Sequence, residues 1–426
     1  MKTAITNGIL LDGNENMEPI KGKILLMDDE MITDIVDEGY DISAYQVLDV
    51  NGRYVMPGLI NMHVHLPSSG KPKNKASDPV KTVKLMTRNN FFRMIVRKLC
   101  EGFAKTQLMS GVTTIRTVGG VEDVDTKIRD RIEHKELLGP RILAANMAVS
   151  VEGGHMAHSL AYAAKTAEEA RMYTNRIVNE HPDLIKLMIT GGVLDAKVKG
   201  EPGVLKMQPD LVKAACQEAH KHNLIVAAHV ESTEGVEVAL ENGVDTIEHG
   251  AKPTPRIIQL FKERQACHIA TLSPALPYAL FDREISHASE MEQYNGNVVF
   301  EGIIECAKEC LANDIPVGLG TDTGCPYITH YDMWRELYYF HKYVGVSNRF
   351  ALYTATKQNA KIAHIDDITG TLEKGKCADI IVTKDNPLED LRALRNVDIV
   401  ITRGTIINHP KVKKMDEVEK ELDKFL

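Results

Sequence analysis

The chain has 426 residues, of which 43% are hydrophobic and 26% are charged, and its formal net charge is −8. These values are typical of a globular protein with a large core, and nothing in the acidic balance indicates a nucleic-acid-binding protein. The first residues lack the basic segment and apolar run of a signal peptide, and no run approaches the ~20 apolar residues of a membrane span. We therefore expect a cytoplasmic protein with no nucleic-acid or membrane partner.

The cysteines support the same compartment. There are seven, an odd number, in a large chain without a CxxC motif, which is typical of reduced cytosolic thiols. Cys306 and Cys310 lie four residues apart in a stretch with helical character, so both could line one face. A thiolate metal site needs more ligands nearby, so this pair alone does not predict one.

The pattern of apolar runs predicts the fold. Residues 1–55 alternate β-rich segments with Gly, Asn and Asp, and the same texture returns near the C-terminus. Between these ends, short apolar runs alternate with helical stretches: "GLINMHVH", "GVTTIRTVGG", "RILAANMAV", "LIKLMITGG", "LIVAAHV", "VDTIEHG", "CHIATL" and "IPVGLGTD". This alternation predicts a parallel sheet, and eight such runs suggest a closed (β/α)8 barrel. The last residues form a helical apolar stripe that we expect to dock on the protein itself, namely Met415, Val418, Leu422 and Phe425.

Two histidines stand at the end of the first apolar run, "GLINMHVHLPSSG". In a strand, residues two apart point to the same side, so His63 and His65 face one way together. If this run is the first barrel strand, they face inward at its C-terminal end, where active sites of such barrels lie. The alternative is a pair of surface histidines on a strand edge.

Three later runs also end in potential metal ligands, namely His229, His249 and Asp322. Each alone is more often a buried polar residue with an ordinary hydrogen-bond partner. Together they bring several potential ligands to one rim of the predicted barrel.

Lys186 lies inside the apolar run "DLIKLM". Lysine is almost never fully buried unless it is paired. One interpretation is an ion pair with a carboxylate such as Asp322. The other is a carbamate formed with CO2, an anion that could bridge two divalent metals in the barrel mouth.

The complete set of HxH, Lys, His, His and Asp resembles the amidohydrolase superfamily. The motifs that carry the resemblance are "PGLINMHVH", "LIKLMITGGV", "VAAHVESTEGVEVALENGVDTIEHG", "GLGTDTG" and "GTLEKGKCADIIV". They are most similar to the prolidase-like, imidazolonepropionase-related branch with a carboxylated lysine. The resemblance implies a TIM-like barrel over residues 56–364. It also implies a small β-sandwich domain built from residues 1–55 and 365–426, the latter ending in the C-terminal helix.

The resemblance also implies the roles of the site residues. Two divalent ions, for which zinc suits the imidazole and carboxylate ligands, would share a nucleophilic hydroxide. Asp322 would move the proton from that hydroxide to the leaving amine. The implied ligands are His63, His65 and Asp322 for the more buried metal, His229 and His249 for the second, and carboxylated Lys186 as the bridge.

Further residues have two interpretations each. His155 is either a substrate contact or a solvent-facing loop histidine. Arg116 matches a family arginine but precedes Thr117 where the family usually has Asp, so the alternative is a structural residue that pairs within the barrel. Glu231 departs from the aromatic residue or histidine of related peptidases. It would favour a cationic substrate end if it faces the site, or it could point into solvent. Residues 68–79, "SSGKPKNKASDP", form either a loop over the site or a solvated loop.

Three functions remain open. The first is a binuclear amidohydrolase that cleaves an amide in a small substrate, such as an Xaa-Pro-like dipeptide or an N-acyl amino acid. The second is a mononuclear deaminase or cyclic-amide hydrolase of imidazolonase type, which would not need Lys186. The third is a noncatalytic barrel with a structural metal. A homo-oligomer is the default expectation for a soluble enzyme of this kind.

Overall fold

The computed structural model describes residues 2–72 and 78–426, and the chain divides into two compact units. The first contains Met1–Asn61, Lys105–Ile115 and Tyr331–Lys414, and the second contains Met62–Ala104, Arg116–His330 and Met415–Leu426. Part of the segment 68–79 that was predicted as a loop, residues 73–77, lies outside the described residues.

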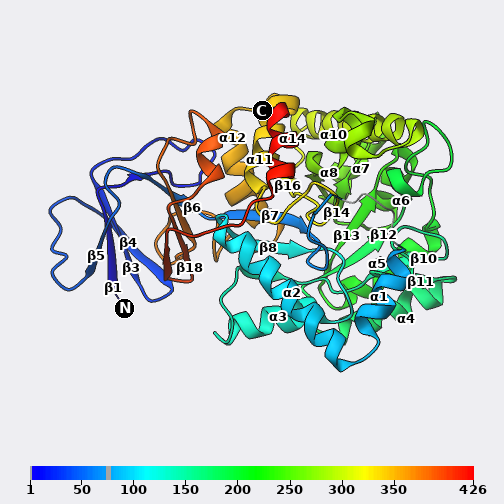
Figure 1. The fold of residues 1–426 in the computed structure, drawn as a ribbon, viewed down its shortest axis with the longest axis horizontal. Coiled ribbons are helices and arrows are strands. Elements are labelled where there is room, and N and C mark those ends of the chain that lie inside the picture. Colours follow the sequence, from blue (N-terminus) through cyan, green and yellow to red (C-terminus); the bar gives the residue numbers. More distant parts are fainter. Residues whose placement is uncertain (1, 73–77) are drawn as a thin grey trace. The chain divides into compact units, whose positions relative to one another are not determined.

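The first unit holds two sheets, of order β4-β3-β1-β5 and β19-β18-β17-β6-β2. The second sheet joins strands from both ends of the chain, because β17 pairs antiparallel with both β6 and β18 (Figure 1). The strands are β1 (Lys2–Thr6), β2 (Ile9–Leu10), β3 (Lys23–Asp28), β4 (Met31–Asp37), β5 (Gln46–Asp49), β6 (Tyr54–Pro57), β17 (Ile380–Thr383), β18 (Ile399–Thr402) and β19 (Thr405–Asn408).

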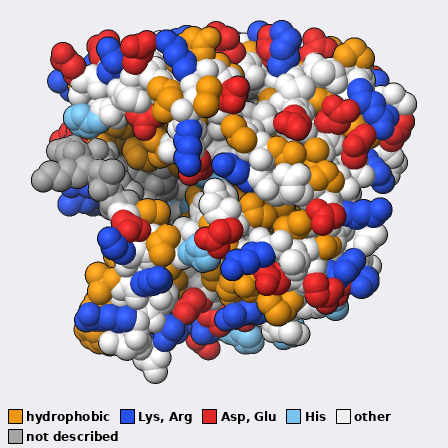
Figure 2. All heavy atoms as spheres, turned by 90° about the vertical axis from the view of Figure 1, so that its right-hand side faces the viewer, with side chains coloured by type: hydrophobic (Ala, Val, Ile, Leu, Met, Phe, Trp, Pro, Cys, Tyr) orange, Lys and Arg blue, Asp and Glu red, His pale blue; other side chains and the backbone are white. Residues whose placement is uncertain are grey.

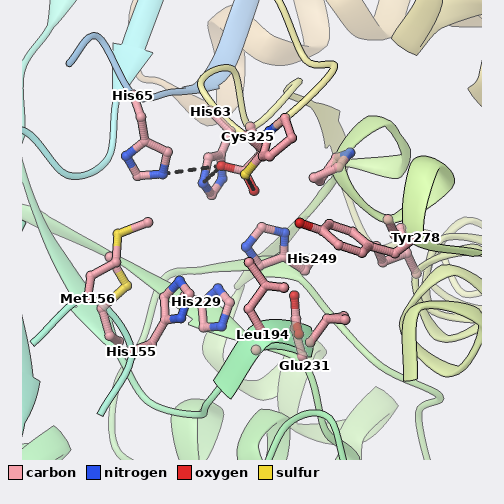
Figure 3. Close-up of a pocket in the computed structure, with 18 of the residues that line it drawn as sticks. His63, His65, His155, Met156, Leu194, His229, Glu231, His249, Tyr278 and Cys325 are labelled. Atoms are coloured by element: carbon pink, nitrogen blue, oxygen red, sulfur yellow. Dashed lines mark hydrogen bonds and ion pairs between the residues drawn. The ribbon is translucent and has the colours of Figure 1, made fainter. Parts of the chain in front are cut away.

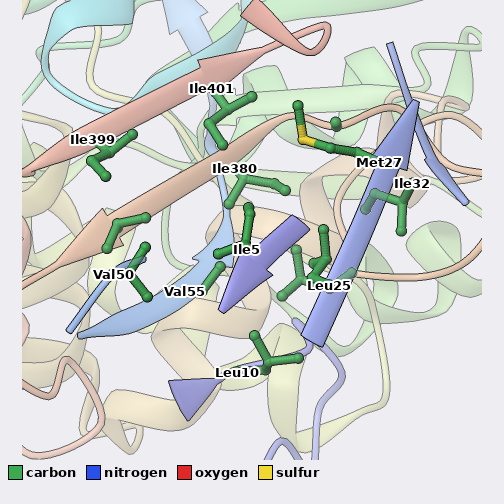
Figure 4. Packing of buried hydrophobic residues seen from close by; sticks show 13 residues of the cluster. Ile5, Leu10, Leu25, Met27, Ile32, Val50, Val55, Ile380, Ile399 and Ile401 are labelled. Carbon is green, nitrogen blue, oxygen red and sulfur yellow. The ribbon is translucent and has the colours of Figure 1, made fainter. Parts of the chain in front are cut away.

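One apolar core lies between these two sheets (Figure 4). Ile5 and Leu25 come from the first sheet, and Ile380 and Ile401 come from the second; all four are buried. Branched residues dominate β17 and β18, "IIVT" and "IVIT", because they fit a pleated and buried surface. The burial of these side chains stabilises the unit, at about 1.5–3 kcal/mol for each large aliphatic residue.

The remaining strands are mostly parallel; β7 and β8 are divided between the two units, and the others belong to the second unit. One sheet has the order β11-β10-β12-β13-β14-β15-β16 with every pairing parallel, and another has the order β7-β8-β9. The strands are β7 (Leu59–Val64), β8 (Val112–Thr117), β9 (Arg141–Leu143), β10 (Ala148–Val151), β11 (Ala161–Ala164), β12 (Leu184–Met188), β13 (Ile225–Val230), β14 (Thr246–His249), β15 (Cys267–Ala270) and β16 (Val317–Leu319).

The eight runs predicted as strands all contain strand residues, so this prediction is confirmed. The run "RILAANMAV" is divided between β9 and β10, and β11, "AYAA", was not predicted because short alanine-rich segments carry no strand signal. A parallel bridge between Val64 and Thr323 joins the end of β7 to the segment after β16. These parallel sheets are consistent with a TIM-like barrel.

Helices follow most of the parallel strands. They are α1 (Pro79–Thr87), α2 (Asn90–Met109), α3 (Val124–Glu133), α4 (Ala167–Val178), α5 (Pro209–Lys221), α6 (Thr233–Glu241), α7 (Pro255–Arg264), α8 (Leu272–Leu280), α9 (Arg283–Ser286), α10 (Glu290–Ala312), α11 (Met333–Tyr339), α12 (Asn348–Tyr353), α13 (Asn359–Ile362) and α14 (Asp416–Leu422). The predicted docking of the C-terminal stripe is confirmed, because Val418 and Leu422 are buried and Phe425 stacks on Phe281.

The mixed surface charge and the cysteine side chains are as expected from the amino-acid composition. Acidic and basic side chains are interspersed over the face drawn in Figure 2. All seven cysteines are free thiols. Among the described residues, none of the helices combines the length and the apolar character needed to cross a bilayer.

Candidate metal centre

The residues predicted for the site line one pocket in the second unit, with a cavity of about 170 Å3 (Figure 3). β7 carries His63, and His65 follows it directly; β12, β13 and β14 carry the lysine and the other two histidines. The pocket residues from the predicted set are His63, His65, His155, Lys186, His229, His249 and Asp322. The structure therefore brings together residues that are up to 259 positions apart, from residue 63 to residue 322.

Asp322 lies at the centre of this group. Its Oδ1 atom is 3.5 Å from Nε2 of His63 and 3.2 Å from Nε2 of His65. The ligand atoms of His63, His249 and Asp322 lie within 4.8 Å of one another, a spacing at which they could hold a metal ion. His249 also belongs to a second such group, with His229 and Glu231.

Hydrogen bonds orient three of the histidine rings. Nδ1 of His63 lies 2.8 Å from Glu248, Nδ1 of His65 lies 2.8 Å from the Gly119 carbonyl oxygen, and Nδ1 of His249 lies 2.7 Å from the Thr271 hydroxyl. With Nδ1 donating to these acceptors, each Nε2 keeps its lone pair for a metal. His229 differs, because its Nε2 lies 3.2 Å from the Gly191 carbonyl oxygen.

Burial keeps the imidazoles of His63, His229 and His249 neutral. It lowers the pKa of His63 to about 4, and it holds the pKa values of His229 and His249 well below the usual value. Burial opposes ionisation of Asp322, but the neighbouring His63 and His65 outweigh it and keep the pKa of this carboxyl low. Neutral imidazoles and an ionised carboxylate are the forms that ligate divalent cations.

Lys186 is only 1% exposed, and its Nζ atom has no hydrogen-bond partner among the residues that the structure describes. The expected alternative, an ion pair with Asp322, is therefore not formed. Burial lowers the pKa of Lys186 to about 8, with Glu248 opposing the shift. The neutral amine is the form that reacts with CO2, and the lowered pKa makes more of it available near neutral pH, so this residue fits a carbamate bridge between cations.

Glu248 is a site residue that the sequence interpretation missed. It is fully buried, and it contacts His63 through one oxygen and Arg116 through both. Burial raises its pKa, but Arg116 and the hydrogen bond from His63 more than reverse this, so the carboxylate stays ionised. The signal in the sequence is the two-residue spacing of Thr246 and Glu248 in "TIEH", which places both polar side chains on the same face of the strand.

Arg116 is a structural residue of the sheet interior, as one interpretation held. Its Nε donates to the Met62 carbonyl oxygen at 2.8 Å, and its Nη2 donates to Glu248 at 2.6 Å. It is fully buried and lies on β8, below the pocket lining rather than in it.

Three of the pocket residues other than glycine have left-handed backbone conformations, namely Met156 and two of the proposed ligands. The φ angles are 67° at His249 and 52° at Asp322. Residues with a Cβ atom rarely adopt this conformation, and such strain of about 1–3 kcal/mol concentrates at functional sites. The strand ends are thus bent at two of the proposed ligands.

The outer part of the pocket contains candidates for substrate contact. The His155 ring stacks on the His229 ring, with 4.2 Å between the two centroids. Its Nδ1 contacts Asp195, which belongs to the 3-10 turn η1 (Val193–Asp195). His155 therefore faces the pocket, and the alternative of a solvent-facing loop histidine is not what the structure has. Glu231 also lines the pocket, and its Oε2 atom is buried without a hydrogen-bond partner. Burial raises the pKa of Glu231 to about 8.

Comparison with known proteins decides the family. The model of the Amidohydrolase family matches residues 54–407. The chain belongs to the amidohydrolase family. Membership confirms the resemblance seen in the sequence, and with it a hydrolase that acts on carbon–nitrogen bonds.

Individual amidohydrolases similar to this chain differ in activity. The crystal structure of a proposed prolidase from Bifidobacterium longum is 32% identical with a TM-score of 0.87, over 99% of this chain and 98% of that one. Ochratoxinase from Aspergillus niger is 22% identical over 92% of this chain and 83% of the relative. A 5-methylthioadenosine/S-adenosylhomocysteine deaminase from Bacillus cereus is 22% identical over 98% of this chain and 96% of the relative.

Proposed function

We propose that this amidohydrolase uses two divalent cations, most suitably zinc, to hydrolyse an amide bond in a small substrate. The substrate class that we favour is a dipeptide of Xaa-Pro type or an N-acyl amino acid. The observation that carries the proposal is the buried Lys186 amine, which lacks a partner and lines the pocket with His63, His249 and Asp322. Bound cations at these residues would supply an activated water and polarise the scissile carbonyl.

Lys186 would act after carboxylation. Its Nζ ammonium would first lose one proton to solvent. The neutral amine would then attack CO2, so that a carbon–nitrogen bond forms as one carbon–oxygen π bond opens, and a second proton would leave the nitrogen. The loss of these two protons turns a cationic side chain into an anionic carbamate. The two carbamate oxygens could then hold two cations, with His63 and His65 on one side and His229 and His249 on the other. A mononuclear site would have no use for this residue.

Asp322 would carry the proton. Its carboxylate accepts the proton of the attacking water and then donates it to the leaving amine nitrogen, which prevents expulsion of an amide anion. The low pKa of Asp322 makes its protonated form short-lived and a strong acid, as this second step requires. His155, stacked on His229 at the pocket wall, is positioned to contact the substrate carbonyl.

Glu231 would select the substrate. Its enclosed oxygen lies in a wall that also contains apolar side chains, including Leu194 and Tyr278 (Figure 3). A buried carboxyl without a partner among the described residues gains most from a cationic hydrogen-bond donor, beside which its pKa would fall and its proton would leave to solvent. We therefore infer a substrate with a cationic group at one end.

The second candidate is a mononuclear deaminase or cyclic-amide hydrolase. The deaminase among the relatives supports it, because that protein covers nearly the whole chain. The two candidates differ in their need for Lys186. A noncatalytic barrel is the least supported function, since the whole predicted ligand set lies in one pocket.

Elemental analysis of protein purified with zinc and bicarbonate tests the proposal. The expected result is hydrolysis of a dipeptide or N-acyl amino acid panel, together with roughly two metals per chain that Lys186→Ala does not retain, a difference that leaves out any zinc bound outside the pocket. Lys186→Ala should lose metal and most activity, whereas the exposed-lysine control Lys213→Ala should keep both. One metal per chain and unchanged turnover in Lys186→Ala would favour the mononuclear candidate.

Several broader inferences accompany this function. We infer that the parallel strands close into one (β/α)8 ring over residues 56–364, and that residues 1–55 and 365–426 form a β-sandwich. We also infer a cytoplasmic homo-oligomer that acts on a small molecule. Sedimentation analysis of the purified protein tests the oligomer directly.

A further inference from the structure

A second cluster of metal-ligating side chains lies outside the pocket. It consists of His268 on β15 and Cys306 and Cys310 on α10. The three potential ligand atoms lie within 4.8 Å of one another, and all three residues are buried. The sequence showed the two cysteines four residues apart on a helix; the strand supplies the partner that the sequence did not reveal.

The His268 ring is held with one nitrogen unused. Nε2 lies 2.7 Å from the His249 carbonyl oxygen, to which it donates. Nδ1 is buried and has no hydrogen-bond partner among the described residues. Burial lowers the pKa of His268, but the neighbouring Cys306 more than reverses this shift, so the ring and the thiol already interact.

One of the two thiols, that of Cys306, is favoured to ionise. The hydrogen bond from the Cys310 thiol, together with the His268 ring and the Ala251 backbone N–H, holds the pKa of the Cys306 thiol well below its usual value. The pKa of Cys310 is raised, because it donates to Cys306. The pair therefore favours one thiolate before any cation binds, which is the form that ligates metals.

The backbone leaves room beside these atoms. Gly250 has a φ angle of 84°, and a Cβ atom there would lie 2.9 Å from Nε2 of His268 and 3.0 Å from Sγ of Cys306. Any side chain at this position would press on both the ring and the sulfur. Glycine thus permits the close approach of β15 and α10 at the cluster.

We propose that His268, Cys306 and Cys310 form a second, thiolate-rich binding site for one divalent thiophilic cation, with Zn2+ as the physiological candidate. Two thiolates and a neutral imidazole would neutralise a divalent ion, and a neutral complex suits a site enclosed in apolar surroundings. Tetrahedral zinc separates such ligand atoms by roughly 3.5–3.8 Å, so the cluster needs only a small contraction. Binding would release the remaining thiol proton to solvent.

This site is chemically different from the candidate metal centre, whose proposed ligands are imidazoles and carboxylates. The two sites are linked through residue 249, since the same residue offers its side chain to the centre and its carbonyl oxygen to His268. The inference does not depend on the proposed reaction, because it concerns binding alone.

Cadmium provides the test, because cadmium–thiolate bonds absorb in the ultraviolet and imidazole or carboxylate ligation does not. Metal-free reduced protein should develop this band as Cd2+ is added, saturating with roughly one thiolate-bound ion per chain. Cys306→Ser should abolish the band. The matched variant Cys216→Ser, at a buried thiol of α5, should keep it.

Cys325→Ser is the decisive control, because Cys325 lines the pocket with Sγ 3.6 Å from Asp322. A band that disappears in Cys325→Ser but survives in Cys306→Ser would place the cadmium in the pocket and overturn the proposal. Absence of any band in the wild type at saturating cadmium would overturn it as well.

X-ray absorption keeps the proposal testable if Cys306→Ser does not fold. The Cys325→Ser protein, saturated with Zn2+, should show sulfur neighbours at about 2.3 Å from zinc. A spectrum with only nitrogen and oxygen neighbours would rule the site out.

Discussion

The carboxylate of Glu248 lies 2.8 Å from Nδ1 of His63, inside the sheet and out of reach of the solvent. This contact fixes the tautomer of His63, because a carboxylate can only accept. It makes Nε2, which faces Asp322, the nitrogen that is open to a metal.

Replacement of Glu248 should therefore weaken metal binding although the residue contacts no metal in the proposed site. In Glu248→Gln the amide can no longer hold the His63 ring through a charged acceptor, and we expect a loss of about 10–100-fold in zinc affinity. Competition with a chelator of known affinity measures it. The surface variant Glu241→Gln should bind zinc as the wild type does, and equal affinity in both variants would contradict the role of Glu248.

Removal of Arg116 should lower the free energy of unfolding. Arg116→Met leaves the Glu248 carboxylate buried without its cation, which costs about 3–5 kcal/mol. The matched variant Arg93→Met breaks an exposed pair with Glu122, for which about 1 kcal/mol or less is expected. Urea unfolding midpoints compare the two. Similar midpoints in both variants would show that the buried pair contributes no more than a surface pair.

Reconstitution of metal-free protein should depend on pH through Lys186. Its pKa is lowered to about 8, so the amine loses its proton as the pH rises through this value and only then reacts with CO2. At a fixed concentration of dissolved CO2, about a tenth of the amine is neutral at about pH 7 and about nine tenths at about pH 9. The rate at which zinc restores activity should rise in parallel. A rate that is flat over this range would be inconsistent with carboxylation of Lys186.

Glu231 should set the preference for charged substrates. In Glu231→Gln the ratio of kcat/KM between cationic and neutral substrates of equal size should fall by roughly tenfold, the worth of one charge-assisted hydrogen bond. Glu234→Gln, an exposed residue of α6, is the control. If the ratio is the same in all three proteins, the cationic end of the substrate does not lie at Glu231.

The sequence predicted the strands and the pocket well because both follow short-range rules. Alternation places His63 and His65 on one side, and parallel strands end at one edge, so the pocket could be assembled before any coordinates. Glu248 was missed because nothing in the sequence distinguishes a carboxylate next to a candidate ligand from other strand residues. Its role became visible only with its partner on β8, Arg116. His268 was missed for the same reason, since its partners lie on α10, 38 and 42 positions away by residue number.

The left-handed backbone at His249 and Asp322 implies a trade-off between function and robustness. Glycine adopts positive φ without strain, so Asp322→Gly would relieve about 1–3 kcal/mol of backbone energy and remove a buried charge. Such a variant would be inactive and yet could melt at a higher temperature than the wild type. Selection for heat resistance alone would then favour variants that have lost activity, whereas selection for turnover retains two residues with strained backbone conformations.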